Sequence, residues 1–315
     1  MPRYRDDFET SRILSDYIKS IEQDEDSMHK MRLDAVVIMQ IYELIFSISA
    51  NNEDLEGMKD ILVRAKKASS YFHRKEAYAI YYNMLSEYYD ILLDGFYDTD
   101  NQDEERILNK MLDAIEKTLF YSKQNISYDI NHLYVKNILA KATILMRSNR
   151  GTVRKIDKLI TNAKKIIIEN TTEYADVRLQ YYLVRAWYYA LVQDDKDMAE
   201  VFIEDALELS NVIIPTDLQK IEDVIIPCAN IYFELCCYNQ AIGLLYKGTR
   251  LCFKHINTDS YAFIRQQLYN HFFQVGIEAQ KVEWCQKMIK LIEIENKEIV
   301  DDKNRVIIPE EVRSL

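Results

Sequence analysis

The sequence is short of the residues that turn and interrupt a protein chain. Its 315 residues include only 6 glycines and 4 prolines. Glycine supplies the left-handed conformation of tight turns, and proline presets turn geometry. Their shortage therefore argues against a sheet with many hairpins and against a glycine-rich phosphate-binding loop, and no Walker or dinucleotide-binding fingerprint is present. What remains is an all-α chain whose helices are joined by short polar turns.

Long hydrophobic runs are also missing. No stretch approaches the roughly 20 apolar residues that a transmembrane helix needs. The first eight residues, MPRYRDDF, contain no apolar core of the kind found in signal peptides. We therefore expect a cytoplasmic protein that does not contact a membrane.

The cysteines follow neither of the common structural patterns. They are odd in number and form no C-x-x-C pair, so they fit neither a disulfide framework nor a zinc site. We expect reduced thiols in the core of a cytoplasmic protein. The five are Cys228, Cys236, Cys237, Cys252 and Cys285.

Acidic residues outnumber basic ones, with 51 Asp and Glu against 40 Lys and Arg, for a net charge of −11. A chain with this charge repels the phosphate backbone of nucleic acids, so we expect no nucleic-acid partner. It attracts basic faces of other proteins. The expected partner is a protein or peptide that is neutral to basic overall.

Apolar residues recur at helical spacing along nearly the whole chain. From the second helix onward, the helices group into pairs that begin near residues 27, 73, 129, 173, 217 and 259, a spacing typical of stacked helical repeats. We expect an N-terminal capping helix within residues 1–26, a repeat array over 27–298 and a C-terminal tail over 299–315. The pattern predicts helices at 5–22, 27–50, 52–70, 73–95, 102–122, 129–149, 152–169, 173–193, 196–210, 216–236, 238–254, 259–278 and 280–298.

One helix contains a proline in its interior. Pro227 lies within the helical pattern that runs from residue 216 to 236. Proline has no backbone N–H, and its ring clashes with the carbonyl four residues earlier, so we expect a kink or a break there.

Two local patterns indicate the type of repeat. The pattern YY-x5-YY occurs at residues 81–89 and again at 181–189. In the segment 232–248, an aromatic residue late in one helix is followed by a small residue at the turn, by Tyr238, and then by alanine and glycine where the second helix packs closely. This segment resembles a tetratricopeptide repeat (TPR). The resemblance implies a TPR-like right-handed α-solenoid of about six antiparallel helix pairs that binds extended peptides on its concave face.

Arginine and tyrosine alternate along one stripe of the helix near 173–193. Both residue types are favoured binding anchors, because they offer a large contact area with a polar end. We expect the change Arg185→Ala to weaken peptide binding and to alter stability little. The alternative is that the tyrosines simply pack between long helices with their hydroxyls reaching solvent. The candidate peptide-binding residues are Arg178, Tyr182, Arg185 and Tyr189, together with Tyr78, Tyr82 and Tyr89 from the equivalent stripe 100 residues earlier.

No set of residues in the sequence indicates catalysis. None of the five histidines belongs to an H-E-x-x-H motif. Cys252 and His255 lie one helical turn apart, and Cys285 could in principle join them around zinc. A core cysteine beside a helix-end histidine is the simpler interpretation. We expect no enzyme, no cofactor and no metal.

These inferences favour a scaffold or adaptor that binds a protein or peptide segment. The alternative is a peptide-responsive regulator, similar to the Rap-type quorum-sensing proteins, whose repeats close around a short signal peptide. Against the regulator, we expect no DNA-binding helix-turn-helix domain before the array, because the predicted helices at 5–22 and 27–50 are too long and too few for one. A bound peptide would favour the scaffold, and compaction on addition of a short peptide would favour the regulator.

Overall fold

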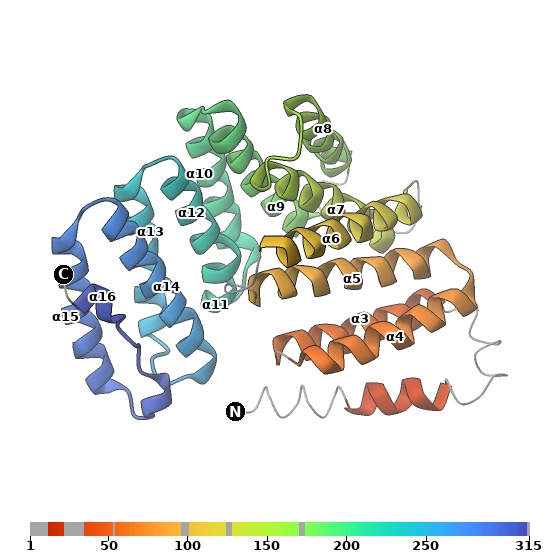
Figure 1. The fold of residues 1–315 in the computed structure, drawn as a ribbon, viewed down its shortest axis with the longest axis horizontal. Coiled ribbons are helices and arrows are strands. Elements are labelled where there is room, and N and C mark those ends of the chain that lie inside the picture. Colours follow the sequence, from red (N-terminus) through yellow and green to blue (C-terminus); the bar gives the residue numbers. More distant parts are fainter. Residues whose placement is uncertain are drawn as a thin grey trace. The chain divides into compact units, whose positions relative to one another are not determined.

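The computed structural model describes residues 12–21, 35–52, 54–95, 101–123, 128–169 and 174–313. Every regular element in these ranges is a helix, and none is a strand (Figure 1). The all-α prediction is therefore confirmed for this part of the chain. None of the helices in the described ranges combines the length and the apolar character that crossing a bilayer requires.

The chain divides into two compact units, residues 1–141 and 142–315. The boundary falls inside α7 (Tyr128–Arg147). The prediction of one continuous array over 27–298 stays a prediction, and the units are described separately.

Unit 1 contains α3 (Ala35–Asn51), α4 (Leu55–Phe72), α5 (Lys75–Gly95), α6 (Asn101–Ser122) and the first part of α7. Helix α3 packs against α4 and α5, and α5 packs along α6. The helical residues 12–21 add Ile18 and Ile21 to the buried core of this unit. The rest of the expected capping helix, 1–11 and 22–26, and the expected helix start at 27–34 lie outside the described residues.

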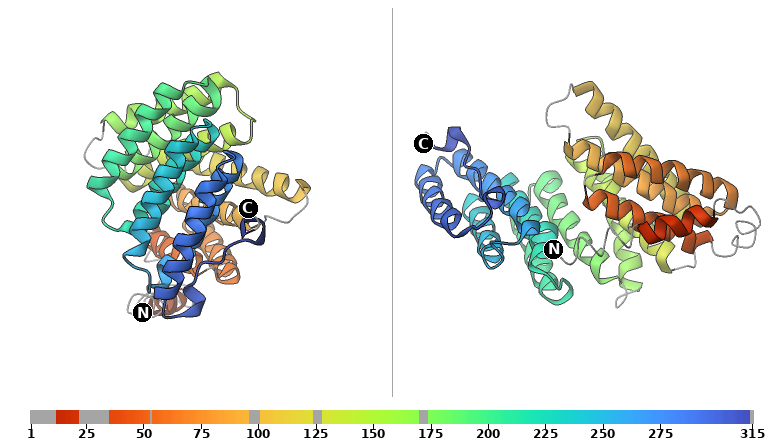
Figure 2. Two further views of the ribbon diagram at one scale, coloured as in Figure 1. Left: turned by 90° about the vertical axis from the view of Figure 1, so that its left-hand side faces the viewer. Right: turned by 90° about the horizontal axis from the view of Figure 1, so that it is seen from below.

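Unit 2 continues with helices that pack in sequence order. Helices α13 to α15, coloured cyan to blue, lie side by side in Figures 1 and 2. After α7 the elements are α8 (Val153–Glu169), α9 (Ala175–Tyr188), the π-helix η2 (Tyr189–Gln193), α10 (Lys196–Ile213), α11 (Asp217–Lys220), the π-helix η3 (Ile221–Ile225), α12 (Ile226–Glu234), α13 (Tyr238–Phe253), α14 (Asp259–Glu278), α15 (Val282–Glu298), the 3₁₀ turn η4 (Asp302–Asn304) and α16 (Glu310–Arg313).

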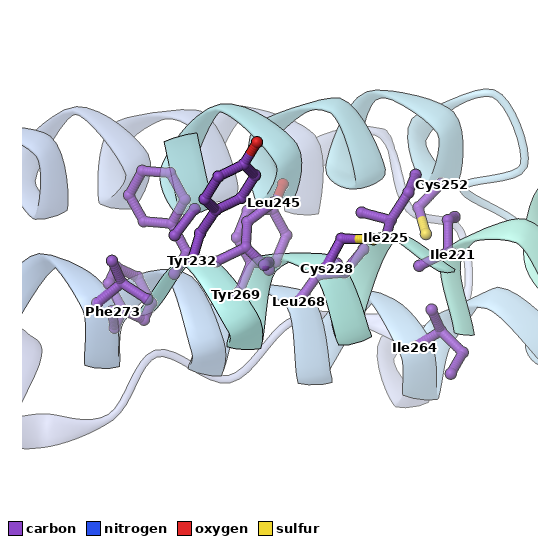
Figure 3. Close-up of a cluster of buried hydrophobic side chains, with 14 of the residues drawn as sticks. Ile221, Ile225, Cys228, Tyr232, Leu245, Cys252, Ile264, Leu268, Tyr269 and Phe273 are labelled. Atoms are coloured by element: carbon purple, nitrogen blue, oxygen red, sulfur yellow. The ribbon is translucent and has the colours of Figure 1, made fainter. Parts of the chain in front are cut away.

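The core of unit 2 allows a close helix approach at one glycine of α13. A Cβ added to Gly248 would lie 2.9 Å from Cδ2 of Leu268 and 3.3 Å from Cγ2 of Ile225. Figure 3 shows these two side chains in the same cluster as Cys228 and Cys252. A side chain at Gly248 would therefore force Leu268 to shift, which agrees with the close helix packing that the sequence predicts for a glycine of this segment.

Four turns of unit 2 share one geometry. Asn149, Asp194, Cys236 and Gln280 each follow a helix with a positive φ of 52°, 52°, 55° and 53°. They lie 45, 42 and 44 residues apart. In each turn the N–H of the next residue donates to a carbonyl near the helix end, as Cys237 does to Tyr232 at 2.8 Å. This is the left-handed helix ending that usually contains glycine, here built without it.

The helix containing Pro227 changes its hydrogen-bond pattern where the sequence predicts a break. The α-helical turn α11 passes into the five-residue π-helix η3, and the α pattern resumes in α12 with Pro227 as its second residue. The missing N–H of Pro227 would otherwise bond to the carbonyl of Asp223, inside η3. The π segment accommodates this loss, because it shifts the hydrogen-bond register by one residue.

The C-terminal segment is folded rather than extended into solvent. Ile299, Val306, Ile308 and Val312 are all buried, and the last three belong to the core of unit 2. The region expected as a tail, 299–315, is thus packed on α14 and α15 as far as it is described.

Candidate functional site

A pocket of about 320 Å³ opens between α8, α9 and α10 of unit 2. Two of the predicted site residues, Arg178 and Tyr182, line it. The complete lining is Lys164, Ile167 and Ile168 from α8, Arg178, Tyr181 and Tyr182 from α9, and Phe202 from α10.

The α8 side of the pocket follows from the helical period. Three consecutive isoleucines lie in the last turn of this helix, and at 100° per residue they cannot all face the core. Ile167 is buried, whereas Ile168 remains 59% exposed beside the pocket. Lys164 is exposed one turn earlier, so this wall combines an apolar surface with a cation.

The α9 and α10 sides supply aromatic rings. The Tyr181 and Tyr182 ring centroids lie 6.4 Å and 6.2 Å from that of Phe202. Burial raises the pKa of the Tyr181 phenol, while the nearby Arg185 partly opposes the shift. The phenol therefore stays neutral at physiological pH and can donate or accept a hydrogen bond. With Lys164 and Arg178, the pocket offers two cations beside an aromatic and apolar floor.

Arg185, another predicted site residue, packs within the protein beside this pocket. Its side chain is only 17% exposed. The guanidinium carbon lies 4.8 Å from the ring centroid of Tyr189 and 5.4 Å from that of Phe202. Nη1 lies 3.9 Å from the Asp157 carboxylate of α8, and the buried Nε has no hydrogen-bond partner among the described atoms.

Tyr189 shares this packing. Its ring stacks on Phe202 with centroids 5.6 Å apart and an interplanar angle of 11°. The structure thus brings Tyr182, Arg185 and Tyr189 together around one ring of α10. Arg185 and Tyr189 hold α9 against α10, and Arg178 and Tyr182 face the open pocket.

The three predicted tyrosines of unit 1 face α6 in a similar way. Tyr78 and Tyr82 stack on Tyr121, with centroids 5.0 Å and 5.8 Å away. Nζ of Lys117 lies 5.2 Å from the Tyr82 ring centroid, and Nζ of Lys110 lies 5.8 Å from the Tyr89 ring centroid. These phenols are partly buried between α5 and α6. They lie in unit 1 and Arg178 to Tyr189 in unit 2, so each stripe forms its own local arrangement.

Five of the pocket residues are not among the candidates that the sequence predicts. They are Lys164, Ile167, Ile168, Tyr181 and Phe202. The run of three isoleucines was a usable signal, because one of them had to face away from the core. Phe202 carried no comparable signal, since a single aromatic residue on an amphipathic helix is ordinary.

A second hollow of about 390 Å³ lies between α13, α14 and α15. It is more apolar than the first, and one lysine contributes to it. Its lining is Ile242, Tyr246, Phe272, Trp284, Lys287, Met288 and Leu291.

Cys252, His255 and Cys285, the residues considered for zinc, make contacts of other kinds. The His255 ring stacks on Tyr261 at 4.4 Å, and its Nε2 lies 3.9 Å from a carboxylate oxygen of Asp217. Cys252 and Cys285 are buried free thiols. No three metal-binding side chains cluster in the portion of the chain that the structure describes.

No protein-family model matches the chain. No curated protein matches it either. Among solved structures, the chain is similar to the crystal structure of BtubC (BKLC) from P. vanneervenii, with a TM-score of 0.50 and 13% sequence identity. The similarity covers 78% of this chain and 89% of that one. At this identity the likeness concerns the all-helical fold alone.

Proposed function

We propose that this protein is a TPR-like scaffold or adaptor that acts in the cytoplasm and binds a peptide segment of another protein. The pocket between α8, α9 and α10 is the site at which part of that peptide docks. The observation that carries the proposal is the combination of Lys164 and Arg178 with the exposed Ile168 beside an aromatic floor. Such a surface recognises a charged and an apolar group at once.

The repeat architecture in this proposal is a right-handed solenoid of about six helix pairs with an N-terminal capping helix. The four left-handed turns spaced 45, 42 and 44 residues apart support it. The fold similarity to BtubC over most of both chains is consistent with it. Helical repeats of this kind present extended surfaces to their partners.

The chemistry of the pocket limits the ligand. Lys164 and Arg178 suit one carboxylate, either a C-terminus or an acidic side chain, and Phe202 with Ile168 suits an apolar side chain beside it. The net charge of −11 opposes a strongly acidic peptide at long range. The expected ligand is therefore neutral or basic overall with one anionic group near an apolar residue.

The test is a selection from a random library of displayed 15-residue peptides against the full-length chain. Peptides that share an apolar residue next to a carboxylate should be enriched. The same peptides should not be retained by the variant Lys164→Ala/Arg178→Ala. Lys165→Ala is the matched control, since Lys165 is exposed on the same helix and does not line the pocket. Enriched peptides that bind the pocket variant as well as the wild type would refute the proposed site.

The peptide-responsive regulator remains the second candidate, and one observation favours it. The π-helices η2 and η3 both lie in unit 2, where η2 continues α9 directly and contacts α10, and η3 also contacts α10. π segments often mark functional sites. Addition of a selected peptide should then reduce the radius of gyration of the full chain in X-ray scattering. An unchanged radius at saturation would exclude the regulator and leave the scaffold.

A further inference from the structure

Two carboxamide side chains hold the C-terminal segment by its backbone. Asn296 of α15 accepts from the N–H of Val306 at 2.9 Å and donates to the carbonyl of Val306 at 3.0 Å. Gln266 of α14 does the same with Ile307, accepting at 2.7 Å and donating at 2.9 Å. In Figure 1 the segment runs between α14 and α15 towards α16.

This arrangement is that of a strand paired on both edges. In an extended chain, the N–H and C=O of one residue point to the same side, and those of the next residue point to the opposite side. Asn296 therefore holds one edge of the segment and Gln266 the other. All four hydrogen bonds go to backbone atoms, so they do not depend on which side chains the segment has.

The side chains of the segment alternate as those of a bound strand do. Val306 and Ile308 are each 5% exposed, whereas Ile307 between them is 74% exposed. Buried Asn304 precedes them, and its carbonyl accepts a hydrogen bond from the fully buried Arg265. The groove thus accepts apolar side chains at positions 306 and 308, and it pairs with the backbone at positions 306 and 307.

We infer that this groove between α14 and α15 is a binding site for extended peptides and that the C-terminal segment occupies it as an intramolecular ligand. The external ligand is a peptide with apolar residues at positions i and i+2, which binds by strand-like backbone pairing. The site is separate from the pocket between α8, α9 and α10, and the inference does not depend on the function proposed for that pocket.

The tether makes the segment a strong competitor. A short link between α15 and the segment, which includes the exposed Val300 and Asp301, places the segment at an effective concentration of about the millimolar range. An external peptide therefore binds weakly until the segment is released. Release exposes Val306 and Ile308 as well as the groove.

The experiment uses the full-length chain and a fluorescent synthetic peptide with the sequence of residues 302–315. Val306→Asp/Ile308→Asp removes the two apolar anchors from the tethered segment and leaves the groove unchanged. Fluorescence anisotropy should show that this variant binds the peptide at least tenfold more tightly than the wild type. Ile307→Asp is the matched control, because Ile307 points to solvent and its change should leave binding at the wild-type level.

The variant Val306→Asp/Ile308→Asp is called the released variant. Adding Asn296→Ala and Gln266→Ala to it should reduce peptide binding by at least tenfold. A folded released variant that does not bind the peptide, or binds it equally well without the two carboxamides, would overturn the inference. Lys164→Ala/Arg178→Ala should not affect this peptide, which separates the result from the proposed function.

Hydrogen exchange of the wild-type chain decides the question if the released variant does not fold. The amides of Val306 and Ile307 should exchange through local release, at least tenfold faster than the slowest amides of α14 and α15. Exchange of these two amides only with global unfolding would mean that the segment is a permanent part of the core, and the inference would fail.

Discussion

Arg185 donates a hydrogen bond from Nη2 to the hydroxyl oxygen of Tyr189 at 2.7 Å, and its guanidinium carbon lies 4.8 Å from the centroid of the same ring. One side chain thus contacts both the polar end and the ring of its neighbour one helical turn away. Phe202 stacks on Tyr189 and connects the pair to α10. Part of the stripe of alternating arginine and tyrosine therefore packs against α10 instead of facing solvent.

This geometry changes the expected effect of Arg185→Ala. The substitution removes packing on three rings and the contact with Asp157, so it should lower the free energy of unfolding by about 1–3 kcal/mol. Chemical denaturation followed by circular dichroism measures the change. Arg154→Ala, an exposed arginine of α8, should change stability by less than about 0.5 kcal/mol. A stability of Arg185→Ala equal to that of the control would mean that Arg185 does not contribute to packing.

Two glycines of α13 provide a matched pair. Gly243 has open space where a Cβ would be added, whereas a Cβ on Gly248 would lie 2.9 Å from Leu268. Gly243→Ala should stabilise the protein by about 0.5–1 kcal/mol, because alanine favours the helix. Gly248→Ala should destabilise it by about 1–2 kcal/mol, because the cost of overpacking against Leu268 is larger than the gain in helix propensity. Thermal unfolding of both variants compares them, and a gain in stability for Gly248→Ala would refute the close approach of the helices.

The half-buried carboxyl of Glu43 should make the stability of unit 1 depend on pH. Burial, and then the charge of Glu87, raises the pKa of Glu43 to about 7, although Lys136 and a hydrogen bond from Asn83 oppose the shift. The folded state therefore holds this proton more tightly than the unfolded state, whose pKa is about 4.5. Its contribution to stability is complete below pH 4.5 and is lost as the pH rises through 7.

The test compares the wild type with Glu43→Gln between pH 5 and pH 8. The wild type should lose more stability over this range than the variant, measured by denaturant midpoints at each pH. Parallel curves for the two proteins would show that Glu43 titrates at an ordinary pKa in the folded state.

The thiols should differ sharply in reactivity. Cys236 is exposed at a left-handed turn, whereas the other four cysteines are buried. Burial raises the pKa of both Cys228 and Cys252 to about 12. Ellman's reagent at pH 8 should modify one thiol rapidly in the native chain and all five in guanidinium chloride. Cys236→Ser should remove the rapid phase. A rapid phase that persists in this variant would mean that a second thiol is accessible to the reagent.

Much of the fold could be predicted because apolar periodicity determines where helices form. The helix predicted over 259–278 agrees with α14, and that over 238–254 agrees closely with α13 (Tyr238–Phe253). The prediction that the cysteines lie in the core is confirmed for four of them and wrong for Cys236, which lies in a turn. That turn could not be recognised from composition, because a cysteine occupies the left-handed position where glycine is usual.

The candidate site was predictable only in part. The spacing of arginine and tyrosine predicts that these side chains share one helix face, but spacing cannot show whether a side chain meets solvent or the next helix. Phe202 decides this for Arg185 and Tyr189, and it lies on a different helix. The hydrogen bonds of Gln266 and Asn296 to the backbone of the C-terminal segment could not be predicted either, since their partners lie 41 and 10 residues further along the chain.

Peptide binding in the pocket between α8, α9 and α10 can be measured by isothermal titration calorimetry of one library-selected peptide. The titrated proteins are the full-length wild type, Lys164→Ala/Arg178→Ala and the control Lys165→Ala. A lost charged hydrogen bond costs about 1.5–3 kcal/mol, so the pocket variant should bind at least tenfold more weakly while the control matches the wild type. Equal dissociation constants for the wild type and the pocket variant would mean that the peptide does not bind in this pocket.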